Sequence, residues 1–359
     1  MTSFNELLGH ARPIQILQTI LDTKKIPNAL LFVGEEGIGK RSAAMIFIKM
    51  LLCQNRSSIE ESNSNVPNEE PSEALLALRQ EKIESGNHPD FTQLILAPDE
   101  TSIKMEAIAA MQEQLIYAPI ESAWKIVLID PADKITMQAQ NSLLKTIEEP
   151  PDYAIIILIA SKIDLLAPTL ISRCQRILFS PLALSQIETI LMDRRGWTQN
   201  EARFAAAWTG GNLGEALTLN LDEARQQEIE YNALVNEEIM AHYESLFETA
   251  KTFSGSVEKL EKALYYLSAY FRDLLVLHAM GGSVPCEDLS DVDESYLVFF
   301  WRKEELIRWA KRMTTQEVTH FLADTTEMTK NISRNINRQL ALETLLMQMR
   351  DKLLKGASG

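Results

Sequence analysis

The chain of 359 residues is too long for one ordinary core, and its 46% hydrophobic and 24% charged residues indicate two or three folded domains. Its formal net charge of −15 argues against a protein that holds DNA by its own surface, because such proteins neutralise phosphates with Lys and Arg. We therefore expect any DNA contact to be made by partner chains.

The N-terminus, the apolar runs and the cysteines argue against a secreted or membrane protein. No apolar run reaches the roughly 18 residues needed to cross a bilayer, and residues 1–6 place no basic segment before an apolar stretch. Cys53, Cys174 and Cys286 are an odd, scattered set, which does not suit a disulfide framework. The sequence predicts a cytoplasmic protein without membrane contact.

Four apolar runs alternate with helical patterns in the first half of the chain. Continuous apolar strands separated by helices indicate a parallel sheet covered on both faces, with its ligand at the carboxyl ends of the strands. The sequence therefore predicts an α/β nucleotide-binding architecture. The runs are residues 29–33, 90–96, 124–130 and 154–160.

A glycine-rich loop lies between the first strand and a helical pattern over 40–52. Gly34, Gly37, Gly39 and Lys40 match the G-x-x-x-x-G-K pattern of a P-loop, in the strand–loop–helix context that this motif requires. Backbone N–H groups of such a loop close around phosphate oxygens, and the lysine adds a positive charge for the distal phosphates. These four residues are the predicted nucleotide site.

The same loop lacks its magnesium ligand. The residue after the lysine should be Ser or Thr, whose hydroxyl binds the cation, and here it is Arg41. A guanidinium has no acceptor atom and repels a cation. Ser42 is about 100° further round the helix and does not substitute. Magnesium-dependent chemistry is not expected.

A polar stretch over about 55–75 follows the P-loop helix and predicts a disordered surface insertion.

The strand that ends at Asp130 resembles a Walker B motif. An active ATPase of this type has an acidic residue next, whereas this chain has Pro131, which neither accepts a proton nor binds a metal. Asp133 is three residues further on. The motif therefore lacks its catalytic acid.

One arginine after the fourth strand is a candidate catalytic residue that would act in a neighbouring subunit. Arg173 lies near the predicted domain edge and could insert into a neighbouring subunit's nucleotide site, where a planar cation stabilises charge on the transferred phosphoryl group. The alternative is an ordinary surface or hinge arginine.

From about Pro181 onward the strand patterns disappear, and residues 184–220 predict a small helical unit.

A stripe of side chains at helical spacing predicts one long amphipathic helix in the C-terminal part, which ends at the glycines 281–282. A loop over 283–294 and further helices follow. The members of the stripe are Leu260, Leu264, Leu267, Phe271, Leu274 and His278.

Two motifs resemble the clamp-loader branch of the AAA+ proteins: residues 141–151, NSLLKTIEEPP, and the later Ser-Arg-Cys at 172–174. The resemblance is specific over most of 1–220 and looser over 221–359. Further matches lie at residues 9–10, 28–32, 88–90 and 337–343, the last being similar to the final helix of that family's collar domain.

This resemblance implies a fold and an assembly. The expected fold class is α/β, with an AAA+ P-loop parallel-sheet domain at 1–180, a small helical lid at 181–222 and an all-α collar for oligomerisation at 223–359. The implied partners are gamma/tau and delta subunits in a hetero-pentamer. That complex loads a sliding clamp on primed DNA during replication.

Within the family, the substitutions resemble the delta-prime branch rather than the hydrolysing gamma/tau subunits. Arg41 and Pro131 stand at catalytic positions, and Gly214 stands where related motors carry a basic sensor. We expect a stator that does not hydrolyse ATP and requires no cofactor; weak ATP or ADP binding is left open. The arginine of the Ser-Arg-Cys motif completes the adjacent ATP site in this family, so Arg173 inherits the role of a catalytic arginine finger in trans.

No metal site is expected. Many bacterial relatives carry four zinc-binding cysteines after the P-loop helix, whereas this chain has only Cys53 there, and no pair of histidines has ligand spacing. Three alternatives remain: an active gamma/tau-like ATPase subunit, a stand-alone DNA-binding protein with a vestigial ATPase fold, and a structural collar protein without an arginine finger.

Overall fold

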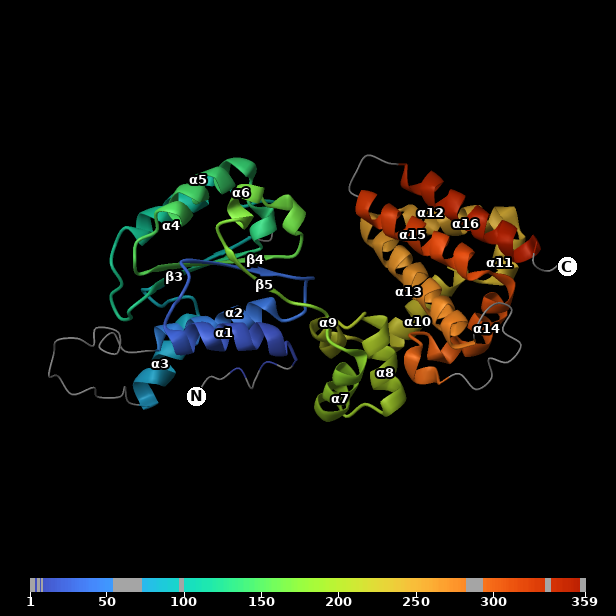
Figure 1. Cartoon of the computed structure of the whole chain (residues 1–359), viewed down its shortest axis with the longest axis horizontal. Helices are drawn as coiled ribbons and strands as arrows, with labels where there is room; N and C mark the ends of the chain where they lie inside the picture. Colours follow the sequence, from blue (N-terminus) through green and yellow to red (C-terminus); the bar gives the residue numbers. More distant parts are fainter. Residues whose placement is uncertain are drawn as a thin grey trace. The chain divides into compact units, whose positions relative to one another are not determined.

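The computed structural model divides into two compact units, Met1–Thr218 and Leu219–Gly359 (Figure 1). The division falls within the predicted lid segment, and the predicted three-domain boundaries stay predictions. Most of the predicted insertion and of the predicted 283–294 loop lies outside the described residues. The structure describes residues 4, 7, 9–53, 73–96, 100–281, 293–332 and 337–355.

Five parallel strands form one sheet in the order β2-β3-β4-β1-β5. The four predicted strands are present, which confirms the predicted α/β class with a parallel sheet. The fifth strand was not predicted because only Ile177 of its four residues is buried. The strands are β1 (Ala29–Val33), β2 (Phe91–Ile95), β3 (Lys125–Asp130), β4 (Ala154–Ala160) and β5 (Gln175–Leu178).

Helices cover both faces of the sheet, as Figure 1 shows. Successive residues of a strand point to opposite faces, so β1 and β4 supply both layers of the core. Leu30 and Ile157 pack under the first group of helices, whereas Leu31 and Leu158 pack under the second. The groups are α1 (Ala11–Thr23), α2 (Lys40–Leu52) and α3 (Glu73–Glu84), and α4 (Met105–Leu115), α5 (Met137–Glu148) and α6 (Pro168–Ile171).

Three further helices complete the first unit after β5. A capping box begins the second of them, where Thr198 and Glu201 satisfy each other's backbone N–H groups. Two single turns of 3-10 helix lie at the carboxyl ends of β3 and β4. These helices are α7 (Leu184–Arg195), α8 (Gln199–Trp208) and α9 (Leu213–Thr218), and the turns are η3 (Ala132–Lys134) and η4 (Ile163–Leu165).

The second unit is entirely helical within the described residues. The predicted long helix is α13, and its predicted stripe is buried, including His278, which contacts the carbonyl oxygen of Ala310 at 2.9 Å. The all-helical character predicted for this part is confirmed. Its helices are α10 (Leu221–Tyr231), α11 (Glu237–Ala241), α12 (Tyr243–Ser254), α13 (Val257–Gly281), α14 (Lys303–Arg312), α15 (Thr315–Asn331) and α16 (Arg338–Lys355), with 3-10 turns η5 (Asn232–Leu234), η6 (Glu294–Tyr296) and η7 (Phe300–Arg302).

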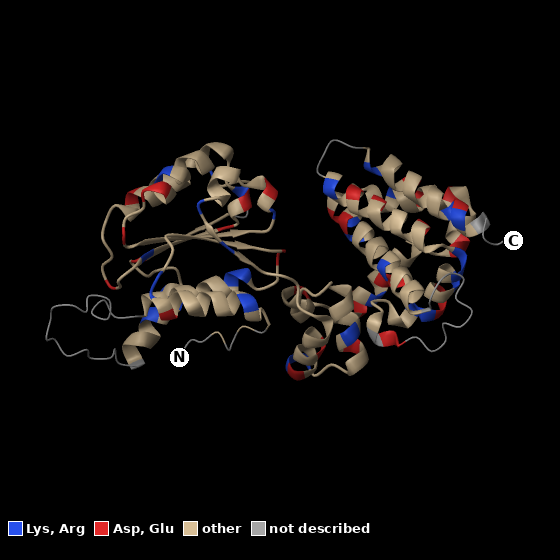
Figure 2. Cartoon of the chain, in the orientation of Figure 1, with Lys and Arg blue, Asp and Glu red and all other residues tan. Residues whose placement is uncertain are grey.

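No described helix combines the length and apolar character that crossing a membrane would require. Figure 2 shows basic and acidic residues interspersed over the helices of both units, while the strands are almost entirely uncharged. This distribution is that of buried strands with solvated helix faces.

Candidate functional site

The predicted P-loop is the connection between β1 and α2. Gly37 and Gly39 have φ of 80° and 101°, a backbone region that glycine adopts without the strain a side chain brings. Gly39 is the residue immediately before the first turn of α2. The loop therefore has the strand–turn–helix context that its sequence predicted.

Lys40 turns back onto its own loop. Its Nζ donates to the carbonyl oxygens of Gly34 at 2.6 Å and Glu35 at 2.5 Å, and to the Ser161 hydroxyl at 3.2 Å. The residue is only 5% exposed. Burial lowers the pKa of its ammonium from the ordinary value, while the charges of Asp130 and Asp133 oppose that shift. Three acceptors within this unit thus occupy the three N–H donors of an ammonium group.

Arg41 forms an ion pair at the place where a magnesium ion would be held. Its Nη1 donates to Asp130 Oδ2 at 2.8 Å, and its Nη2 donates to Gln93 Oε1 at 2.9 Å. The aspartate at the end of β3, Asp130, is therefore paired with the guanidinium of Arg41. The guanidinium thus occupies the carboxylate that would hold a divalent cation, and its fixed positive charge opposes one. The residues do not fit a magnesium nucleotide complex.

Two polar residues of this site were not predicted as its members. Ser161 directly follows β4, and its hydroxyl accepts from Lys40. Asp133 lies in η3, and its Oδ1 accepts from the Ser161 N–H at 3.3 Å. Both lie where parallel strands end, which is the one signal in the sequence that could have identified them. They link β3, β4 and the P-loop into one polar cluster.

The first residues of α9 lie directly against the P-loop. Asn212 Nδ2 donates to the Glu36 carbonyl oxygen at 2.7 Å, and the Gly214 N–H donates to the Gly37 carbonyl oxygen at 3.2 Å. A Cβ added at Gly214 would lie 2.5 Å from that oxygen, and one at Gly37 would lie 2.6 Å from the Asn212 side chain. Glycine at both positions is what permits this approach. We call these two hydrogen bonds the lid latch.

His10 supports the P-loop from its N-terminal side. Its Nε2 lies 2.6 Å from the Ile38 carbonyl oxygen, so the neutral imidazole donates this hydrogen bond from Nε2. Its ring packs edge-on against Phe179, with 5.2 Å between centroids. Burial lowers the pKa of this histidine, and the hydrogen bond partly opposes the shift. The Gly-His pair at 9–10 was noted in the sequence only as a family match.

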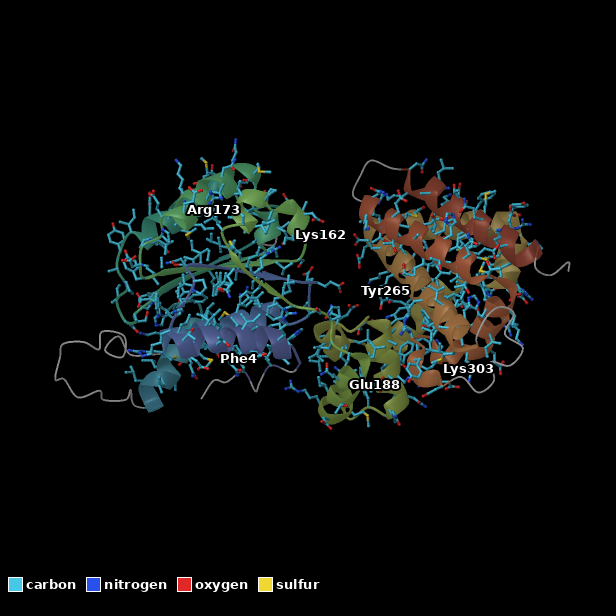
Figure 3. All side chains as sticks on the ribbon, viewed as in Figure 1. Phe4, Lys162, Arg173, Glu188, Tyr265 and Lys303 are labelled. Atoms are coloured by element: carbon cyan, nitrogen blue, oxygen red, sulfur yellow. The ribbon has the colours of Figure 1, made fainter. Side chains whose placement is uncertain are left out.

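Arg173 lies between α6 and β5 and contacts α5 and α6 instead of the P-loop (Figure 3). Its Nη1 donates to the Thr169 carbonyl oxygen at 3.0 Å, and its Nη2 lies 2.6 Å from Glu148 Oε1. The side chain is 40% exposed. The structure thus brings Gly34, Gly37, Gly39 and Lys40 together in one loop and holds Arg173 apart at the surface.

Comparison with known proteins gives one consistent family. A family model described as "DNA polymerase III, delta subunit" matches residues 9–183. The delta-prime subunit of DNA polymerase III from Bacillus subtilis is 28% identical over 351 residues, which is 97% of each chain. Both comparisons show that the chain is similar to clamp-loader subunits of DNA polymerase III. The resemblance expected from the two motifs is thereby confirmed.

Another subunit of DNA polymerase III and one solved structure are also similar to this chain. The tau subunit from Bacillus subtilis is 26% identical over 292 residues, covering 81% of this chain and 45% of tau. A solved structure of a gamma subunit-related protein from Thermotoga maritima is 17% identical, with a TM-score of 0.40, and covers 94% of this chain and 99% of its own.

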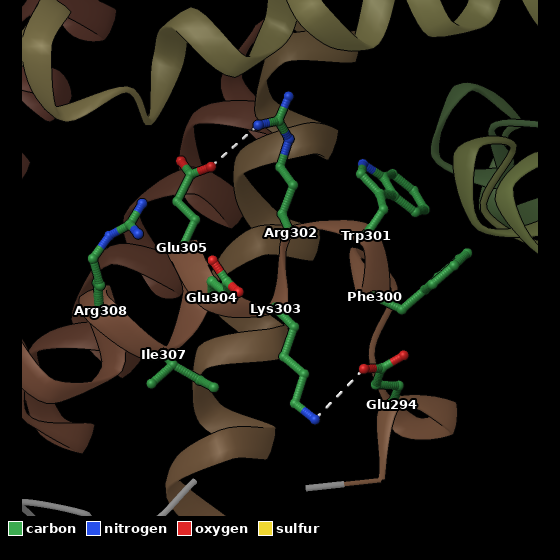
Figure 4. A pocket seen from close by; sticks show the side chains of 9 residues that line it. All are labelled: Glu294, Phe300, Trp301, Arg302, Lys303, Glu304, Glu305, Ile307 and Arg308. Atoms are coloured by element: carbon green, nitrogen blue, oxygen red, sulfur yellow. Dashed lines mark hydrogen bonds and ion pairs between the residues drawn. The ribbon is translucent and has the colours of Figure 1, made fainter. Parts of the chain in front are cut away.

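A hollow of about 680 Å³ lies in the second unit, beside η7 and α14 (Figure 4). Charged side chains around it pair with one another: Arg302 with Glu305 at 3.1 Å, and Lys303 with Glu294 at 3.5 Å. Arg302 also forms an ion pair with Glu228, which is only 5% exposed. These pairs connect α10, η6, η7 and α14 of the second unit. Among the described residues, no group of three or more His, Cys, Asp or Glu side chains could hold a metal ion.

Proposed function

We propose that this chain is the delta-prime-like subunit of a DNA polymerase III clamp loader and that its own P-loop does not hydrolyse ATP. The observation that carries the proposal is the ion pair between Arg41 and Asp130 at 2.8 Å. It places a guanidinium on the carboxylate that a hydrolysing site needs for magnesium. Pro131, next in the chain, supplies no catalytic acid. Gly34, Gly37, Gly39 and Lys40 form a degenerate nucleotide site for which no cofactor is required.

The lid latch supports a role as a stator. Asn212 and Gly214 donate hydrogen bonds directly to the P-loop carbonyl oxygens of Glu36 and Gly37. These contacts hold the start of α9 against the loop. The subunit therefore offers its neighbours a fixed surface.

Arg173 is the proposed contribution to catalysis in trans. A guanidinium that is 40% exposed can reach a phosphate on another chain, whereas one buried in its own unit cannot. Two contacts with α5 and α6 fix its orientation. In the neighbouring site it would stabilise charge on the transferred phosphoryl oxygens. The partners in this proposal are gamma/tau and delta subunits in a cytoplasmic hetero-pentamer, which meets the clamp and primed DNA as a complex.

Reconstitution of the loader with gamma/tau and delta subunits tests the finger. Arg173→Ala should lower ATP turnover at the neighbouring site, stimulated by clamp and primed DNA, by about 10³-fold, as loss of an arginine finger does. Arg176→Ala is the matched control, because Arg176 is an exposed arginine three residues further along. Gel filtration checks that both complexes assemble.

Unchanged turnover with Arg173→Ala in an intact complex would remove the catalytic role and leave a structural collar protein. An active gamma/tau-like subunit is the other candidate. It predicts turnover by the purified chain alone, which the Arg41–Asp130 pair argues against.

A further inference from the structure

The carboxyl end of α5 meets the turn after α6 through one ion pair. Glu148 is the last residue of α5, and its Oε1 lies 2.6 Å from Arg173 Nη2. The opposite branch of the guanidinium, Nη1, donates to the Thr169 carbonyl oxygen at 3.0 Å. The two terminal nitrogens are therefore each held by one acceptor, and the plane of the group is fixed.

We propose that Glu148 is the positioning residue of Arg173, holding the guanidinium ready for a phosphate on the neighbouring subunit. This inference rests on the arginine-finger role proposed above. Glu148 is 45% exposed and Arg173 40% exposed, so the pair lies at the surface and not in the core. A pair buried in the core would serve packing; this one orients a group that still faces solvent.

The chemistry favours orientation over charge neutralisation alone. A guanidinium carries five N–H donors, and the two contacts use only part of that set. The remaining donors can meet a phosphate while Glu148 and Thr169 stay bound. An arginine already held in its working geometry loses less rotamer freedom when the phosphoryl group arrives, and such preorganisation acts on the transition state.

The next residue supplies a matched control. Glu149 is also an exposed glutamate, and its backbone N–H bonds to the Lys145 carbonyl oxygen at the end of α5. No contact joins its side chain to Arg173. Removal of either glutamate changes the chain's charge equally, and only one of the two removes the contact with the guanidinium.

The reconstituted loader with gamma/tau and delta subunits provides the test, with kcat and KM for ATP measured separately. Glu148→Ala should lower kcat about tenfold with KM unchanged, because the finger is misplaced but present. Glu148→Gln, whose amide oxygen can still accept from Arg173, should restore most of that loss. Glu149→Ala should match the wild type. Glu148→Ala combined with Arg173→Ala should be no slower than Arg173→Ala alone.

The outcomes separate this inference from the proposed function. If Arg173→Ala lowers turnover but Glu148→Ala equals Glu149→Ala, the finger stands and the positioning role is wrong. A rise in kcat with Glu148→Ala would also overturn it, since Glu148 would then restrain the finger. If Arg173→Ala itself has no effect in an assembled complex, the finger role fails and the positioning role fails with it.

Discussion

At the scale of single residues, the two cations that follow the P-loop glycines are paired within this chain. Lys40 satisfies its ammonium with Gly34, Glu35 and Ser161, and Arg41 pairs with Asp130. The sequence predicted which residues do not suit hydrolysis. It could not reveal what they would do instead, because Arg41 and Asp130 are 89 positions apart and only the parallel sheet brings them together.

The buried histidine beside the P-loop gives a pH-dependent prediction. His10 has a lowered pKa in the folded chain, so the unfolded chain, with an ordinary value near 6.5, takes up a proton first as pH falls. The contribution of His10 to the free energy of unfolding should therefore be constant above about pH 7 and decrease as pH falls through about 6.5. His10→Gln keeps a donor for the Ile38 carbonyl oxygen but does not titrate.

Urea denaturation at pH 7.5 and pH 5.5 measures this effect. The decrease between the two pH values should be smaller for His10→Gln than for the wild type. The pKa of His88 is lowered by burial too, and that residue is present in both proteins, so its contribution cancels in the comparison. Equal decreases in the two proteins would show that His10 is not the group responsible.

At the scale of elements, strands and long helices could be predicted and contacts between distant loops could not. Continuous apolar runs identified β1 and β4 because both faces of these strands are buried. β5 has one buried residue and gives no such pattern. The two hydrogen bonds of the lid latch join residues 176 and 177 positions apart, so no local pattern carries them. In the sequence, Gly214 was interpreted only as the absence of a basic sensor. In the structure, its lack of a side chain permits the close contact between α9 and the Gly37 carbonyl oxygen.

The lid latch predicts a specific effect of one methyl group. Gly214→Ala places a Cβ 2.5 Å from the Gly37 carbonyl oxygen, a backbone atom that cannot move away cheaply. Overpacking of this kind costs about 1–3 kcal/mol, so α9 should separate from the P-loop more easily. Hydrogen exchange of the amides at the start of α9 should become faster by tenfold or more, while β1 and β4 stay protected.

Gly255→Ala is the control for that substitution. The nearest atoms to a Cβ there lie at 3.5 Å or beyond, in ordinary van der Waals contact. Exchange in α9 should be unchanged in this variant. If Gly214→Ala behaves in the same way, the contact with Gly37 does not hold α9.

At the scale of the whole molecule, the chain combines an internally hydrogen-bonded P-loop with an exposed arginine that contacts α5 and α6. Both lie in the unit Met1–Thr218, and the helical unit that follows carries internal ion pairs such as Arg302 with Glu228. The acidic balance of −15 agrees with a subunit that leaves DNA contact to its partners. Such a protein would contribute to ATP turnover without performing it.

ATP turnover by the purified chain tests this central claim most directly. The measurement is phosphate release with magnesium and ATP in excess, for the wild type and for Lys40→Ala, which removes the P-loop ammonium. We expect both proteins to release phosphate at the same background rate, because Arg41 occupies the carboxylate that magnesium would need. Turnover by the wild type that Lys40→Ala abolishes would contradict the account and identify the chain as an active ATPase subunit.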